Sequence, residues 1–314
     1  MPLRRFLTCC VLLLAACSGE TDERSERQET QVEVGTIVET GPFAVEGLPN
    51  QKLTIWLPPG YEKSDRNYPV LYMHDGHNLF DPAQSNFNKV WAADKAIVEL
   101  SERGTIEPHI IVGMWPHGED RYRQYLPQIA AEKSTGALAE SVAENALGKD
   151  VVSARYLEWI ADELKPQIDS DYRTQTGPAN TAIAGSSMGG IMSCYAIVER
   201  PDIFGRAACV SSHWPIALPD IADQSKAQVD RIWRDWLAAE LGEPDGRRIW
   251  MDHGTETLDA YYPPYQVEID KSFEAAGWSR GIDWRSEQYD GAEHEENAWA
   301  ERLSEVLGWL LAKE

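Results

Sequence analysis

The sequence is poor in cysteine, and this shortage excludes a disulfide-rich fold. Only five of its 314 residues are cysteine, and three of these, Cys9, Cys10 and Cys17, lie at the extreme N-terminus. Cys194 and Cys209 remain for the rest of the chain. They allow at most one disulfide, and two separate buried thiols are the alternative.

Basic residues are also scarce. The 29 Lys and Arg stand against 51 Asp and Glu, which gives a formal net charge of −22. Such a chain is repelled by phosphate backbones, so we expect no nucleic acid partner, and anionic polymers are disfavoured as substrates. No internal repeat is visible, and roughly 280 residues beyond the N-terminal segment are enough for one domain with a large core.

A long apolar run that could span a bilayer is missing from the N-terminus. The run at 6–16 is too short for this and follows Arg4 and Arg5, as in a signal peptide. It ends in Leu-Ala-Ala-Cys17, which resembles a bacterial lipoprotein signal, in which the cysteine is lipidated; an ordinary secretion signal is the alternative. We therefore predict export and a lipid anchor on Cys17, in the outer membrane if the host is Gram-negative.

The segment after this cysteine contains many charges and has no apolar period. Such a composition cannot bury a core, so it predicts a disordered tether. The predicted organisation is a signal peptide at 1–16, a tether at 17–30 and one catalytic domain at 31–314.

Short apolar runs alternate with helical periodicity along this domain. An alternating stretch at 51–57 predicts a half-exposed antiparallel strand. Buried strands are predicted at 69–73, 109–114, 181–184, 206–210 and 248–251, and helices at 90–102, 152–168, 188–199, 264–276 and 296–312. This order predicts an α/β fold with a mostly parallel sheet, antiparallel N-terminal strands and helices on both faces. In such a fold, chemistry takes place at the carboxyl ends of the strands.

A glycine-rich string directly follows the predicted strand 181–184. It reads Gly185-Ser-Ser187-Met-Gly-Gly190 and runs into a helical segment. The pattern is typical of a nucleophile elbow, because residues without Cβ let the strand and helix backbones pass at a sharp turn. It predicts Ser187 as the nucleophile of an α/β-hydrolase, and a purely structural turn is the alternative.

A serine nucleophile needs a histidine base and an acid that orients the base, in the chain order serine, acid, histidine. His294 lies between the last predicted strand and the C-terminal helix, where the base belongs. His253 ends a strand directly and is expected only to form a hydrogen bond there.

The acid is expected in the loop after strand 248–251. Asp259 is predicted, because it lies far enough beyond the Gly254 turn to reach the base. Glu256 is the alternative acid, and Asp252, which is still tied to the strand, is a third candidate.

The segment that follows strand 69–73 reads His74-Asp-Gly-His77-Asn-Leu-Phe-Asp81. The fold places an oxyanion donor in this loop, so the backbone N–H groups of His77 and Met188 are the predicted oxyanion hole. A metal site built from the histidines and aspartates of this loop is the alternative, but the elbow already supplies a mechanism that needs no metal or cofactor.

Five strings together resemble the Putative esterase family, which includes esterase D, feruloyl and acetylxylan esterases, siderophore esterases and mycolyltransferases. They are Tyr72-Met-His-Asp-Gly-His-Asn-Leu-Phe80, Arg121-Tyr-Arg-Gln-Tyr-Leu-Pro127, Glu163-Leu-Lys-Pro166, the elbow, and His294-Glu-Glu-Asn-Ala-Trp299. The resemblance implies the α/β-hydrolase fold and the same two oxyanion donors. The sequence departs from the family pattern at one position, since His77 stands where the family is expected to have glutamine.

Trp115, Arg121 and Trp214 fall near strand ends and are candidate substrate-binding residues, although core packing and pairing with acids would also explain them. The expected activity is hydrolysis of a sugar-linked, siderophore or small acyl ester through an acyl-enzyme. An acyltransferase with the same triad and a non-catalytic surface-binding lipoprotein are the alternatives.

Overall fold

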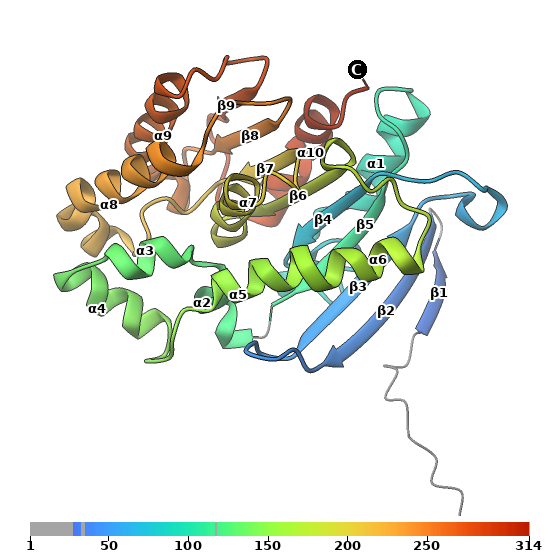
Figure 1. The fold of residues 1–314 in the computed structure, drawn as a ribbon, viewed down its shortest axis with the longest axis horizontal. Coiled ribbons are helices and arrows are strands. Elements are labelled where there is room, and N and C mark those ends of the chain that lie inside the picture. The colour runs from blue at the N-terminus through green and yellow to red at the C-terminus, as the bar shows by residue number, and fades with distance from the viewer. Residues whose placement is uncertain (1–27, 33–34, 117, 314) are drawn as a thin grey trace, which may run out of the picture.

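A computed structural model describes residues 28–32, 35–116 and 118–313, so the signal peptide and Cys17 lie outside the described residues. The nine strands, named in chain order, form one sheet in the order β1-β2-β3-β5-β4-β6-β7-β8-β9 (Figure 1). They span β1 Gln28–Val32, β2 Gly35–Phe43, β3 Gln51–Leu57, β4 Val70–His74, β5 Ile110–Trp115, β6 Thr181–Ser186, β7 Arg206–Val210, β8 Arg248–His253 and β9 Trp284–Gln288.

The sheet is antiparallel at its N-terminal edge and parallel beyond it. β1, β2 and β3 pair antiparallel, and β3 also pairs antiparallel with β5. Every pair from β5 through β4 to β9 is parallel. The predicted α/β-hydrolase architecture is therefore confirmed, although β1 begins inside the segment that the sequence assigned to the tether.

Helices cover both faces of the sheet. They span α1 Ala93–Glu102, α2 Arg121–Tyr125, α3 Gln128–Lys133, α4 Gly136–Asn145, α5 Ser153–Glu158, α6 Lys165–Asp171, α7 Met188–Glu199, α8 Pro219–Glu240, α9 Pro263–Ala275 and α10 Glu296–Leu310. A π-helical turn at Trp159–Leu164 joins α5 to α6. One face carries α1 and α10, which contact each other, and the other carries α5 to α9 (Figure 1).

The alternation of side chains along β4 explains why two cores form. Leu71 and Met73 pack into the core beneath α1 and α10, whereas Val70 and Tyr72 pack into the opposite core. Since successive strand residues point to opposite faces, a strand that is apolar throughout must be covered on both sides. Among the described helices, none is both long and apolar enough to cross a membrane.

Candidate active site

The nucleophile candidate Ser187 lies in a strained turn between β6 and α7. Its φ and ψ are 56° and −120°, a conformation that costs a side-chain-bearing residue roughly 1–3 kcal/mol. A Cβ on Gly185 would lie 2.8 Å from the backbone of Gly189, so this close strand–helix approach requires glycine. The elbow predicted from the sequence is thus the observed geometry.

Backbone hydrogen bonds tie this turn to the carboxyl end of β7. The N–H of Ser187 donates to the carbonyl of Val210 over 3.0 Å, and the N–H of His213 donates to the carbonyl of Ser187 over 3.1 Å. The neighbouring strand therefore supplies the contacts that hold Ser187 in its left-handed conformation.

His294 and Asp259 meet at the carboxyl ends of the parallel strands, where Ser187 also lies. His294 Nδ1 lies 2.6 Å from Asp259 Oδ1, and the backbone N–H of His294 donates to Thr257 Oγ1 over 2.8 Å. Burial acts to raise the pKa of Asp259, but hydrogen bonds from His294, Ser211 and Gly254 bring it below its ordinary value. At neutral pH the aspartate is therefore an anion that holds one nitrogen of the imidazole.

The other two loop acids have different surroundings. The side chain of Glu256 is exposed to solvent. Asp252 is fully buried, and its carboxylate accepts hydrogen bonds from Arg302 over 2.8 Å and from the indole of Trp250 over 2.7 Å. Asp259 is therefore the loop acid that meets His294, as the sequence analysis expected from its distance beyond the turn.

A buried phenol connects the nucleophile to the histidine. The ring of His294 packs edge to face against Tyr262 and Trp299, with ring centroids 5.6 Å and 5.1 Å away. The Tyr262 hydroxyl lies 2.8 Å from His213 Nδ1, and the Ser187 side chain is close enough to act on the pKa of this phenol. Ser187 and His294 thus converge on Tyr262.

Sequence reasoning assigned no catalytic role to Tyr262 or His213. Burial lowers the pKa of His213 to about 3 and raises that of Tyr262 well above its ordinary value, so both are neutral at neutral pH. His213 follows β7 as Ser187 follows β6, so its place after a parallel strand was the available signal. Tyr262 lies between the 3-10 turn Thr257–Tyr261 and α9, where packing alone also explains an aromatic side chain.

The predicted oxyanion loop follows β4. Asp75 adopts a left-handed φ of 56°, and a short 3-10 turn at Gly76–Asn78 follows it. A Cβ on Gly76 would lie 2.6 Å from the Trp115 ring, so the loop can approach β5 only with glycine there. The turn places His77 after this glycine. Met188 opens α7, and N–H groups in the first turn of a helix lack an intrahelical acceptor.

Residues 49–310 match the model of the Putative esterase family. The chain belongs to this family of carboxylic ester hydrolases. It is 25% identical over 166 residues to the uncharacterized protein YbbA of Bacillus subtilis, a match that covers 52% of this chain and 58% of that protein. It is 26% identical over 159 residues to an endo-1,4-beta-xylanase/feruloyl esterase of Xylanibacter ruminicola, covering 49% of this chain and 18% of that protein.

Both matched segments span less than two thirds of the curated relative concerned. Among solved structures, the IroE-like serine hydrolase of Shewanella oneidensis superposes with a TM-score of 0.61 at 18% identity. That match covers 92% of this chain and 80% of that chain. At this identity the likeness shows the fold alone.

Arg121, a predicted substrate-binding residue of this esterase-family chain, is engaged by the oxyanion loop. Its Nε and Nη2 donate to the two carboxylate oxygens of Asp75, each over 2.7 Å. Burial acts to raise the pKa of Asp75, but the charge and hydrogen bonds of Arg121 lower it overall. The guanidinium therefore fixes the residue that precedes Gly76.

The described residues contain no group of three or more His, Cys, Asp or Glu side chains able to hold a metal.

Of the two interpretations of Trp214, substrate binding is wrong and core packing is what the structure shows. The side chain is 1% exposed, and its indole N–H donates to Gln266 Oε1 over 2.9 Å. It packs edge to face against Trp233 in the core. Trp115 remains partly exposed and packs against the ring of His77, at 5.6 Å between centroids.

A pocket of about 170 Å³ opens beside the nucleophile. Its wall is mainly apolar, with His213 and Asn145 as polar members, and its apolar residues include Met188, Ile216, Leu218 and Leu258. Such a lining suits the carbon skeleton of an uncharged group held next to Ser187.

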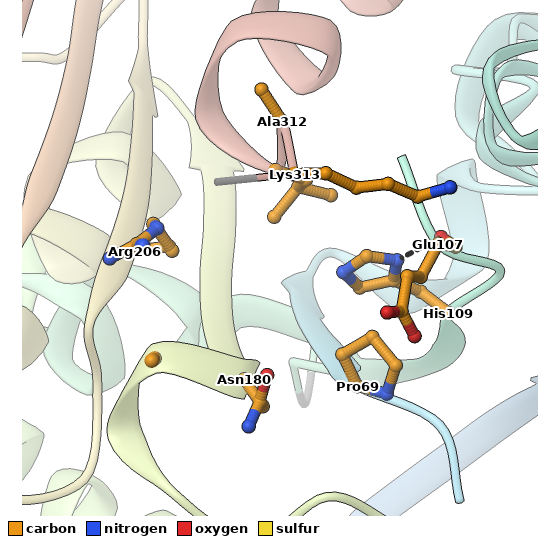
Figure 2. A pocket seen from close by; sticks show the side chains of 9 residues that line it. Pro69, Glu107, His109, Asn180, Arg206, Ala312 and Lys313 are labelled. Carbon is orange, nitrogen blue, oxygen red and sulfur yellow. Dashed lines mark hydrogen bonds between the residues drawn. The ribbon is translucent and has the colours of Figure 1, made fainter. Parts of the chain in front are cut away.

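A larger pocket of about 410 Å³ is lined by residues at the amino ends of parallel strands (Figure 2). Pro69, His109 and Asn180 directly precede β4, β5 and β6 there, and Arg206 begins β7. The residues of the elbow and the His294–Asp259 pair all follow the carboxyl ends of strands. The larger pocket is therefore separate from Ser187, His294 and Asp259.

We predict that Arg121→Gln lowers the free energy of unfolding at neutral pH by about 1–3 kcal/mol, because it leaves the buried Asp75 carboxylate without its partner. The loss should shrink as the pH falls through the lowered pKa of Asp75, since a protonated carboxyl has no charge to pair. Thermal unfolding at several pH values measures both effects.

The matched control is Arg103→Gln, which removes an exposed pair with Glu99 and should change stability by about 0.5 kcal/mol or less. An unchanged thermal midpoint for Arg121→Gln, together with a raised KM, would mean that Arg121 binds substrate instead of holding Asp75.

Proposed function

We propose that this protein hydrolyses carboxylic esters through an acyl-enzyme, with Ser187 as nucleophile, His294 as general base and Asp259 as the orienting acid. The observation that carries the proposal is the 2.6 Å contact between His294 and Asp259 at the same sheet edge as the strained Ser187. Hydrogen bonding to Asp259 keeps the proton on Nδ1, which leaves Nε2 free to accept the Ser187 proton.

The reaction then follows from the positions of these groups. Ser187 Oγ attacks the ester carbon as its proton moves to His294, and the carbonyl oxygen gains negative charge. The backbone N–H groups of His77 and Met188 are proposed to stabilise this charge, and one such donor is typically worth about 3 kcal/mol of barrier. His294 next protonates the departing alcohol. Water, activated by the same base, finally cleaves the acyl-enzyme and regenerates Ser187.

The substrate is proposed to be a small-molecule or carbohydrate ester with an uncharged acyl or alcohol group in the apolar pocket beside Ser187. The net charge of −22 disfavours a polyanionic substrate. The feruloyl esterase among the relatives and the IroE-like serine hydrolase among the structures guide the choice of candidates. A screen of feruloyl, acetyl-sugar, siderophore and short acyl esters identifies the substrate class. Added alcohol distinguishes an acyltransferase, which would form a new ester.

The N-terminus is proposed to carry a lipid anchor on Cys17, after cleavage of residues 1–16. The proposal rests on the short apolar run, the small residues before the cysteine and the polar segment after it. It would place the catalytic domain outside the cytoplasm, with access to esters in the cell envelope or beyond it.

The first prediction of this mechanism is that Ser187→Ala lowers kcat/KM for 4-nitrophenyl acetate about 10³-fold or more, because no other nucleophile replaces it. His294→Ala should be similarly inactive. His253→Ala serves as the matched control, since the hydrogen bond of that ring goes to the backbone carbonyl of Gly254 and not to a member of the proposed triad, and it should keep most of the activity. Substantial activity in Ser187→Ala would reject the acyl-enzyme mechanism.

The acid is tested by replacing its charge. Asp259→Asn should lower kcat by about 10³–10⁴-fold with little change in KM, because the amide favours the wrong imidazole tautomer. Glu256→Gln should have nearly the wild-type kcat, since that side chain is exposed. The reverse pattern would identify Glu256 as the acid.

The anchor predicts that the wild-type chain partitions with membranes and that Cys17→Ser prevents lipidation and changes this distribution. Mass spectrometry of the mature N-terminus measures the processing site and the added lipid directly. An unmodified N-terminus at another residue would contradict the anchor and leave the catalytic proposal untouched.

A further inference from the structure

Ser211 stands directly behind the proposed acid. It follows β7 with a left-handed φ of 40°, and its side chain is fully buried. Its hydroxyl oxygen lies 2.7 Å from Asp259 Oδ2, 3.0 Å from Trp299 Nε1 and 2.8 Å from Arg302 Nη2. Three polar groups, one from the loop after β8 and two from α10, therefore meet on one hydroxyl.

The chemistry of these partners fixes where the hydroxyl proton points. The indole N–H and the guanidinium are donors only, so Trp299 and Arg302 occupy the two lone pairs of Ser211 Oγ. The single proton of Ser211 is then left for Asp259, which as a carboxylate can only accept. Asp259 Oδ2 also accepts the N–H of Gly254 over 2.6 Å, while Oδ1 faces His294.

A buried ion pair holds this arrangement in place. Arg302 Nη2 also donates to Asp252 Oδ1 over 2.8 Å, and the two side chains are 3% and 0% exposed. Asp252 Oδ1 accepts the backbone N–H of Ser211 as well, over 3.1 Å. Both the backbone and the side chain of Ser211 are thus connected to one ion pair between β8 and α10.

We propose that Ser211, supported by Arg302 and Trp299, is a positioning residue of the catalytic machinery that keeps Asp259 ionised and oriented toward His294. The inference rests on the proposed function, because Ser211 acts only through the acid. Its hydroxyl, polarised by a cation and an indole, is a stronger donor than an isolated serine. Asp259 therefore binds His294 through Oδ1 and is itself bound by Ser211 through Oδ2.

The alternative role is purely structural: the same contacts could serve only to attach α10 to the sheet. The two roles differ in pH dependence. Removing a donor from a carboxylate raises its pKa, so the coupled Asp259–His294 pair takes up its proton at higher pH. If Ser211 positions Asp259, its removal would move the acid limb of the pH profile of kcat/KM to higher pH. If its contacts only attach α10 to the sheet, its removal would lower the free energy of unfolding and leave this profile in place.

Other charged or titratable groups also lie near Asp259. Arg302 and Asp252 form the ion pair behind Ser211. His213 and Tyr262 face Asp259 from the β7 and α9 sides, and both are neutral at neutral pH because burial displaces their pKa values. A shift of the acid limb on removal of the Ser211 hydroxyl therefore reports the Asp259–His294 pair.

The test compares Ser211→Ala with Ser212→Ala in the full-length protein, using 4-nitrophenyl acetate. Ser212 is equally buried, but its hydroxyl donates to the carbonyl of Cys209 over 3.0 Å, so its removal should leave the pH profile unchanged. Ser211→Ala should lower kcat about 10–100-fold at nearly constant KM and move the acid limb up by about one pH unit. Ser211→Gly, which suits the left-handed φ, is the second variant if alanine impairs folding.

A double-mutant cycle tests whether Ser211 acts through the acid. In an Asp259→Asn background, Ser211→Ala should cause no further loss of kcat, because the charge it serves is gone. Additive losses, or a wild-type pH profile in Ser211→Ala and Ser211→Gly, would overturn the proposal and leave only the anchoring role.

A readout that needs no substrate separates this proposal from the proposed function. The low-field proton resonance of His294 Nδ1–H, followed by NMR across pH, should titrate at higher pH in Ser211→Ala than in the wild type. If the wild-type protein cleaved no ester, or Ser187→Ala remained active, the hydrolase proposal would fail, and this titration would still decide the role of Ser211.

Discussion

The left-handed backbone of Ser187 is the constraint on which the rest of the site depends. A turn of roughly 1–3 kcal/mol strain persists only where its surroundings over-determine it. Here the parallel neighbour β7 supplies those surroundings, through the carbonyl of Val210 and the N–H of His213. The glycines of the elbow then allow α7 to pack against β6. Ser187, the proposed nucleophile, is therefore held partly accessible at the carboxyl ends of the parallel strands.

The same parallel arrangement explains how residues far apart in the sequence meet. The loops after β4, β6, β8 and β9 all leave one edge, and they carry His77, Ser187, Asp259 and His294. No single loop holds the complete chemistry. The register of the strands sets the relative positions of these four residues. Contacts with buried side chains such as Tyr262 then fix their orientations.

The sequence could predict the parts of the site that depend on local pattern. Ser187 has the glycine spacing of an elbow, and His294 has a defined place between a strand and a helix. Asp259 followed from loop length. What could not be predicted were partnerships across the fold. The sequence left Trp214 open between substrate binding and core packing, and it packs on Trp233, because the direction of a side chain after a strand depends on neighbouring helices. Pairing with an acid was one of the two interpretations of Arg121, but the identity of that acid, Asp75, could be found only in the structure.

Two arginine–aspartate pairs lie behind the proposed machinery, and their placement suggests why charge is retained there. Arg121 pairs with Asp75 under the oxyanion loop, and Arg302 pairs with Asp252 behind the acid. A buried ion pair often contributes little net stability compared with apolar packing of the same volume, because both ions lose their hydration. Its directional hydrogen bonds nevertheless fix geometry in a way that apolar contacts do not. Each pair here fixes a segment with left-handed backbone, Asp75 itself in one case and Ser211 in the other. The two segments carry the proposed oxyanion loop and the support of the proposed acid, so these charge pairs lie where the proposed reaction requires fixed positions.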